Sequence, residues 1–235
     1  MIQNLPTHIS IIFLLTVLAT LILFFLSLKK SSDEKVKSKA NLIAIGLIAW
    51  LILQSIISFT EFYADTNSFP PKFIFAIAPP FLMIGFLFVT KSGRKFIDSL
   101  PLENITYTNV VRIPVELVLY ALYFCHTIPQ LMTFEGRNFD IVAGITAPVI
   151  AYFGFTKKLI GRKWILIWNF FSLALLLNIV VNAVLSVPFP FQQLAFEQPN
   201  IAVLYFPFSL LPAFIVPVIL FGHLVSIRQL IISEK

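Results

Sequence analysis

The chain has 235 residues, of which 58% are hydrophobic and only 12% charged, and its formal net charge is +6. An ordinary soluble domain carries roughly twice that share of charged residues, so the composition excludes the soluble globular class. The apolar residues come in runs of about 20, the length that crosses a hydrocarbon core of roughly 30 Å. We therefore predict an all-α polytopic membrane protein in which residues 1–235 form a single transmembrane domain.

Seven predicted spans follow one another along the chain, separated by short connections. They cover His8–Leu28, Ala40–Thr60, Phe73–Thr90, Thr106–Met132, Phe139–Phe155, Trp164–Val187 and Tyr205–Ile227. The first and fifth spans would cross the membrane in the same direction. This order allows a three-plus-one-plus-three arrangement, a type of internal repeat that occurs in transporters.

The basic residues predict how the spans are oriented. Of the 17 Lys and Arg residues, fourteen lie in alternate connections or near the C-terminal end, whereas the opposite connections hold only Lys72 and Arg137. The positive-inside rule then places the N-terminus outside and the C-terminus in the cytoplasm, in a plasma (bacterial inner) membrane. The basic excess is explained by topology, so we expect the lipid bilayer as a partner and no nucleic acid. A homo-oligomer or a larger membrane complex remains open.

The fourth predicted span carries polar residues at steps of three or four, which places them on one helix face. They are Asn109, Arg112, Glu116, Tyr120, Tyr123, Thr127 and Gln130. Arg112 and Glu116 are the only formal charges well inside a span, and such residues are costly in a bilayer and mark candidate functional sites. At a spacing of four they can reach each other, so we expect them to pair together or with adjacent helices. Pro114 predicts a kink between them.

Polar residues on neighbouring spans suggest a cavity that opens to the outer face and ends at Glu116. The expected ligand-binding residues are Arg112, Glu116, Tyr120, Tyr123, Thr127, Asn178, Asn182 and Asp140. The expected rim consists of Glu61, His126, Glu135 and Arg137. For any single Asn, an interhelical hydrogen bond that only supports packing is the alternative interpretation.

The histidines and the cysteine do not indicate a metal or redox centre. His8, His126 and His223 have no metal-binding spacing, and Cys125 has no second cysteine to pair with. We expect no metal and no cofactor. His223, at a depth similar to that of Arg112, is a candidate proton relay.

The predicted function is transport or binding of a small molecule or ion. The interior charges, the polar residues on several spans and the lack of a soluble domain favour it. The first alternative is a membrane-embedded enzyme acting on a lipid or isoprenoid through Glu116, His126 or Asp140. The second is a non-catalytic subunit or receptor. The chain contains no hydrolase or nucleotide-binding motif, which favours a protein that is not an enzyme.

Overall fold

The computed structural model describes residue 2 and residues 5–232 of the chain. Within that part all regular structure is helical and no strand occurs, which confirms the predicted all-α class. The α-helices are α1 (Thr7–Lys29), α2 (Glu34–Phe59), α3 (Ile74–Val89), α4 (Lys91–Asp98), α5 (Leu102–Tyr107), α6 (Arg112–Phe124), α7 (Asp140–Ala151), α8 (Arg162–Leu185) and α9 (Val216–Ile232). Short 3-10 turns cover Phe62–Ala64, Thr108–Val111, Gln130–Met132 and Ala202–Leu204, and π-helical turns cover Tyr152–Thr156 and Leu211–Ile215.

Several of these helices are long and apolar enough to cross a membrane. Five segments in the described part meet this condition alone: α1, α2, Leu102–Phe124, α8 and Leu211–Ile232. A sixth is obtained if α3 and α4, which meet at a bend of 94°, are counted as one broken span. α7 with its π-helical continuation to Thr156 is apolar but shorter. The helices are therefore compatible with a membrane protein.

The predicted fourth span differs from the observed helix at its C-terminal end. The helix stops at Phe124, whereas the prediction continued to Met132. His126 takes a left-handed backbone conformation with φ of 55°, and Pro129 follows three residues later. A left-handed residue interrupts the helical hydrogen-bond ladder, and a proline cannot restore it. Thr127 therefore lies beyond the helix, and the continuous polar face predicted for this region is wrong at its outer end.

The irregular backbone near Arg112 lies one turn earlier than predicted. The 3-10 turn Thr108–Val111 precedes α6, so Pro114 is only the third residue of the new helix. Pro114 has no N–H to donate to the carbonyl four residues earlier, and that residue, Val110, belongs to the 3-10 turn. The irregular backbone therefore lies directly before the charged residue Arg112.

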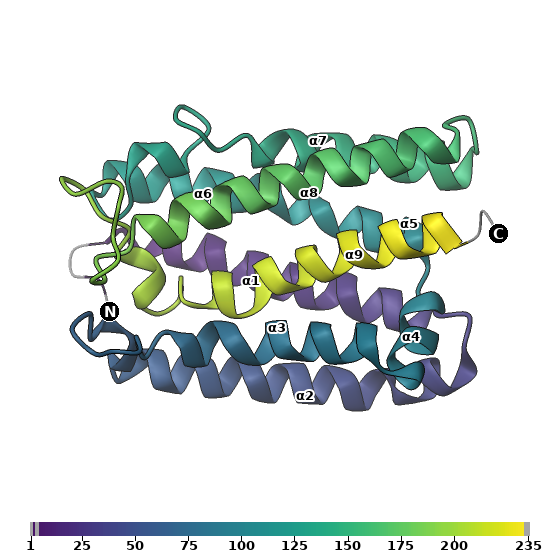
Figure 1. Cartoon of the computed structure of the whole chain (residues 1–235), viewed down its shortest axis with the longest axis horizontal. Coiled ribbons are helices and arrows are strands. Elements are labelled where there is room, and N and C mark those ends of the chain that lie inside the picture. The colour runs from purple at the N-terminus through teal and green to yellow at the C-terminus, as the bar shows by residue number, and fades with distance from the viewer. Residues whose placement is uncertain (1, 3–4, 233–235) are drawn as a thin grey trace.

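The helices run side by side along the length of the molecule, and the two ends of the chain lie at opposite ends of the bundle (Figure 1). α9 packs against α8 and α5, and α1 packs against α2, α5 and α6. Leu102–Phe124 and Leu211–Ile232 are the most buried of the five candidate spans, whereas α2 is the least buried. The interior of the bundle is therefore built around α5, α6 and α9.

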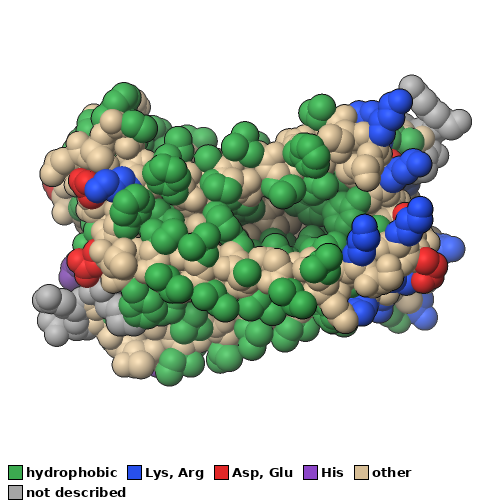
Figure 2. All heavy atoms as spheres, turned by 90° about the horizontal axis from the view of Figure 1, so that it is seen from below, with side chains coloured by type: hydrophobic (Ala, Val, Ile, Leu, Met, Phe, Trp, Pro, Cys, Tyr) green, Lys and Arg blue, Asp and Glu red, His purple; other side chains and the backbone are tan. Residues whose placement is uncertain are grey.

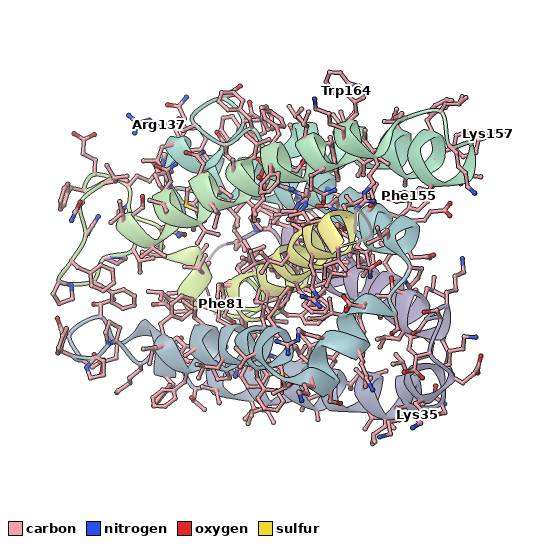
Figure 3. The ribbon with its side chains drawn as sticks, turned by 45° about the vertical axis from the view of Figure 1, so that its right-hand side comes forward. Lys35, Phe81, Arg137, Phe155, Lys157 and Trp164 are labelled. Carbon is pink, nitrogen blue, oxygen red and sulfur yellow. The ribbon has the colours of Figure 1, made fainter. Side chains whose placement is uncertain are left out.

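Charged side chains are distributed unevenly between the two ends of the bundle. Figure 2 shows Lys and Arg gathered at the end that also holds the C-terminus, while hydrophobic side chains cover the middle of this face. Lys35 and Lys157 lie toward that basic end, and Arg137 lies toward the opposite end (Figure 3). An apolar band between two polar ends is the surface expected of a bilayer-spanning bundle.

Candidate functional site

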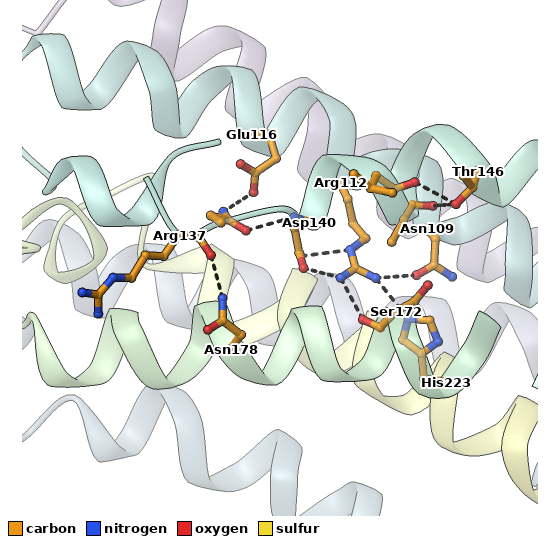
Figure 4. A network of polar contacts seen from close by, with 12 residues as sticks. Asn109, Arg112, Glu116, Arg137, Asp140, Thr146, Ser172, Asn178 and His223 are labelled. Carbon is orange, nitrogen blue, oxygen red and sulfur yellow. Dashed lines mark hydrogen bonds and ion pairs between the residues drawn. The ribbon is translucent and has the colours of Figure 1, made fainter. Parts of the chain in front are cut away.

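A buried network of polar side chains is centred on Arg112, the first residue of α6 (Figure 4). Its Nε donates to Asp140 Oδ2 at 2.9 Å, and its Nη2 donates to Asp140 Oδ1. Nη2 also donates to the Ser172 carbonyl at 3.1 Å, and Nη1 donates to Asn109 Oδ1 at 3.3 Å. Two nitrogens of the guanidinium thus donate to the two oxygens of one carboxylate, the bidentate geometry that gives strong Arg–carboxylate pairs. The ion pair therefore joins α6 to α7 inside the bundle.

The hydrogen bonds of His223, on α9, define the tautomer of its ring. Nε2 lies 3.1 Å from Arg112 Nη1, and Nδ1 lies 3.1 Å from Asn169 Oδ1. Because a guanidinium N–H can only donate, Nε2 must accept and the proton must reside on Nδ1. That N–H then donates to Asn169, whose own amide donates to the Ile165 carbonyl at 2.9 Å. His223 thus links α6, α8 and α9 as a neutral, fully engaged side chain.

Of the two pairings expected for Arg112, with Glu116 or with a group on an adjacent helix, the structure shows the second. The ion pair of Arg112 is with Asp140, a residue of the neighbouring helix that the expected cavity also included. A basic residue four positions before an acidic one is the less favourable order on a helix. Asp140 offers a two-point contact instead. The expectation that the charges would find partners on adjacent helices is confirmed for Arg112.

Only one of the two carboxylate oxygens of Glu116 has a hydrogen-bond partner. Its Oε1 accepts a hydrogen bond from Asn138 Nδ2, which also donates to the Met132 carbonyl at 3.1 Å. Asn138 Oδ1 in turn accepts from the backbone N–H of Asp140 at 3.1 Å. Glu116 Oε2 is buried and has no hydrogen-bond partner. A buried carboxylate oxygen without a donor is costly, so this atom marks a site that the protein itself leaves incomplete.

The same hydrogen bonds place Asp140 at the start of α7. Asp140 is the first residue of the helix and does not cap it through its side chain, which is committed to Arg112. Asn138 supplies the side-chain acceptor at this turn instead. One short turn therefore positions both carboxylates relative to each other.

A partly open cavity of about 110 Å³ lies against these two carboxylates. Its polar lining residues are Glu116, Asp140 and Asn200, and all other lining residues are apolar. The apolar walls come from α3, α6, α8, the outer connection and the start of the C-terminal helix: Phe73, Ile77, Phe81, Val115, Leu119, Met132, Leu176, Ile179, Val180, Ala183, Val184, Val187, Val203, Leu211, Pro212 and Val216. The cavity is therefore much less polar than predicted.

The long connection after α8 contributes to the cavity wall. Asn200 and Val203 line it, and Asn200 Oδ1 is buried without a hydrogen-bond partner. The backbone N–H groups of Ile201 and Ala202 both donate to the Thr127 carbonyl, at 3.0 and 3.1 Å. These bonds fix the connection against the chain just after α6.

The other sequence-predicted binding residues lie outside the cavity wall. Tyr120 donates through its hydroxyl to Glu135 Oε1 at 2.8 Å, and Thr127 Oγ1 donates to the Leu122 carbonyl at 2.9 Å. Asn178 Nδ2 donates to the Arg137 carbonyl at 2.7 Å. Tyr123 and Asn182 do not line the cavity either, and Asn182 Nδ2 donates to the Asn178 carbonyl at 3.0 Å. Of the eight predicted binding residues, the structure brings Glu116 and Asp140 to the cavity and Arg112 directly behind them.

The four expected rim residues lie in connections between the helices. His126 Nδ1 is 3.2 Å from Gln198 Oε1, and Glu61 takes a left-handed conformation with φ of 57° directly after α2. Glu135 and Arg137 are exposed on the turn before α7. None of the four lines the cavity. Among the described residues, no group of three His, Cys, Asp or Glu side chains lies close enough to hold a metal ion.

Four residues that build the site are not among those predicted from the sequence: Asn138, Asn169, Ser172 and Asn200. Asn169 and Ser172 lie three positions apart on the α8 face that also buries Leu176, and this spacing was a usable signal. Asn138 carries only the signature of a turn residue, and Asn200 lies in an irregular connection. No local pattern distinguishes those two from ordinary loop residues.

Two further buried polar contacts lie near the C-terminal end of α2. The Tyr63 hydroxyl donates to Gln54 Oε1 at 2.6 Å, and Ser209 Oγ donates to Ser58 Oγ at 2.8 Å. Burial raises the pKa of Tyr63, which lies in the connection after α2, to about 12 despite the hydrogen bond with Gln54. The bond ties that connection to α2.

A larger apolar hollow lies on another side of the bundle. Its volume is about 560 Å³, and it is lined by residues of α1, α2, α3, α4 and the C-terminal helical segment, among them Trp50, Pro80 and Phe221. Trp50 Nε1 donates to the Ala213 carbonyl at 3.0 Å, which is the carbonyl that Pro217 leaves without an intrahelical donor. Lipid chains suffice to fill such a surface in a bilayer.

Comparison with known proteins gives one match. Residues 68–231, more than two thirds of the chain, match the family described as Domain of unknown function (DUF8737). The chain belongs to this family. The matched region includes α3 to α8 and nearly all of α9, and with them every residue of the Arg112 network and the cavity wall. No curated protein and no solved structure matched the chain.

Proposed function

We propose that this protein is a seven-span carrier for a small molecule or ion, with Glu116 as the group that takes up a proton or cation. In this proposal α1, α2, α3, Leu102–Phe124, α7, α8 and α9 are the spans. The N-terminus lies outside and the C-terminus in the cytoplasm of a plasma membrane of the bacterial inner-membrane type.

The positions of the chain ends support an odd number of crossings. The two termini lie at opposite ends of the bundle, and α7 with its continuation to Thr156 runs alongside the longer helices (Figure 1). The bend of 94° after α3 leaves α4 as a segment along the membrane surface and not as part of a span. The basic residues at the C-terminal end support the cytoplasmic assignment of that end.

The observation that carries the transport proposal is the charge balance around Glu116. Arg112, Glu116 and Asp140 are the buried Arg, Lys, Asp or Glu residues of the described part. The interior therefore holds one positively charged group and two carboxylates, and the positive charge of Arg112 is paired with Asp140. An uncompensated charge in a low-dielectric interior is costly, so Glu116 favours a proton or a bound cation. A carboxylate with one free oxygen on a cavity wall suits reversible uptake of either.

Flux measurements on purified protein in liposomes test this proposal. An imposed membrane potential drives ions inward, and an internal pH-sensitive dye and a cation-sensitive dye report their movement. We expect flux above that of empty liposomes for the unmodified protein and for Glu135→Gln, which removes an exposed carboxylate. Glu116→Gln should reduce the flux to the background. Equal flux through Glu116→Gln and the unmodified protein, or no flux above empty liposomes, would overturn the proposal.

A further inference from the structure

We propose that the cavity beside Glu116 binds a small protonated amine with an apolar body, its ammonium group held by Glu116 Oε2 and Asn200 Oδ1. This inference rests on the proposed role of Glu116 as the cation site. It adds the chemical class of the ligand, which follows from the hydrogen-bonding capacity, the charge and the apolar walls of the cavity.

The free hydrogen-bonding atoms of the cavity are all acceptors. Glu116 Oε2 and Asn200 Oδ1 are buried, lack partners and belong to lining residues. The third polar lining residue, Asp140, has both oxygens engaged by Arg112. No lining residue has a buried unpartnered donor. A ligand that satisfies this site must therefore bring N–H or O–H groups, and an ammonium group brings three.

The charge of the site selects a monovalent cation. Arg112 and Asp140 neutralise each other, and the ring of His223 is held in its neutral tautomer. Glu116 is then the one excess charge at the cavity. One positive charge on the ligand balances it, whereas a ligand carboxylate would add a like charge beside Glu116 and Asp140.

The walls distinguish an organic cation from a metal ion. A calcium ion takes six to eight oxygen ligands, and this cavity offers only two unpartnered oxygens among apolar side chains. Phe73 and Phe81 line it, and aromatic rings attract cations as well as apolar groups. Its volume of about 110 Å³ is somewhat below the ~150 Å³ of an apolar cavity that holds benzene. Because the cavity is open on one side, a compact amine of about five to eight non-hydrogen atoms can bind with the far end of its apolar body at the opening.

Calorimetric titration of the detergent-solubilised full chain tests the inference. The ligands are n-butylamine and benzylamine as hydrochlorides, with benzyl alcohol and benzoate as neutral and anionic counterparts of similar shape. We expect the amines to bind, benzyl alcohol to bind at least about tenfold more weakly and benzoate not to bind. Glu116→Gln should weaken amine binding at least about tenfold, whereas Glu135→Gln should leave it unchanged.

A second variant tests the contribution of the apolar wall independently of the Glu116 carboxylate. Ala183→Leu adds volume to the apolar wall without changing a polar group, so it should weaken benzylamine binding more than n-butylamine binding. Amine binding unaffected by both Glu116→Gln and Ala183→Leu, or no amine binding to the unmodified protein, would overturn the inference. Proton flux that depends on Glu116 without amine binding would overturn the inference alone. Amine binding without any flux would overturn the carrier proposal alone.

Discussion

Arg112 and Asp140, 28 residues apart in the sequence, form a two-point ion pair across the contact between α6 and α7. Both side chains are buried, and the guanidinium also contacts His223 and the Ser172 carbonyl. Four segments of the bundle therefore meet at one positive charge. Removing that charge alone would leave Asp140 buried without a counterion.

Arg112→Met should therefore lower the free energy of unfolding by about 3–5 kcal/mol, the usual result of removing one member of a buried pair. Asp140→Asn should also lower the free energy of unfolding, because it leaves Arg112 buried without a counterion. The double variant should recover much of the lost stability. Thermal and denaturant unfolding in detergent of both single variants and the double variant measures the coupling. The pair Arg112→Met and Glu116→Gln serves as the control, with weaker coupling because those side chains do not contact each other. Additive effects at Arg112 and Asp140 would contradict the ion pair.

Gly144 allows α7 to approach α6 closely at the ion pair. A Cβ atom at this position would lie 2.9 Å from Ile113 Cγ1 and 3.1 Å from the Ile113 backbone nitrogen, whereas a Cβ at Gly46 meets nothing within 4 Å. Gly46→Ala should stabilise the protein by up to about 1 kcal/mol through helix propensity. Gly144→Ala should gain less because Ile113 must move, and Gly144→Leu should destabilise by about 1–3 kcal/mol. Melting temperatures compare the three, and equal gains for both alanine variants would contradict the close approach.

The proposed topology can be tested with single cysteines introduced into a Cys125→Ser background. Arg137→Cys and Glu197→Cys should react with a membrane-impermeant maleimide in intact cells. Lys35→Cys and Lys157→Cys should react only after the membrane is opened. All four residues are exposed, so accessibility within the fold does not limit labelling. Labelling of Lys35→Cys or Lys157→Cys in intact cells would contradict a cytoplasmic location for the basic end.

Tyr63 should give the protein a stability that depends on alkaline pH. Burial raises its pKa from 10.0 to about 12, so the folded state holds the proton more tightly than the unfolded chain. The contribution is fully present below pH 10 and is lost as the pH rises through about 12. The stability of Tyr63→Phe, which lacks the hydroxyl, should fall less steeply over this interval than that of the unmodified protein. Identical pH profiles for the two proteins would contradict the buried, protonated hydroxyl.

The sequence was sufficient to locate most of the long helices and the charged residues of the site. Runs of about 20 apolar residues leave the backbone no alternative to internal hydrogen bonding in lipid, so helix positions such as α1 and α8 could be predicted closely. The rarity of charge inside such runs identified Arg112 and Glu116 as residues that need partners. The end of the fourth helix at Phe124 was missed because a left-handed residue at His126, and not a change in hydropathy, terminates it.

Only the tertiary structure determined which polar side chains pair with each other. Along one helix, spacing predicts which side chains can meet, but Asp140 reaches Arg112 because α7 packs on α6 next to Gly144. Asn138 then donates to one oxygen of Glu116 from the turn before α7, and the second oxygen of this cavity-lining residue is left without a partner. A partner across a helix interface depends on the rotation and separation of both helices, and these are set by packing throughout the bundle and by no local sequence pattern.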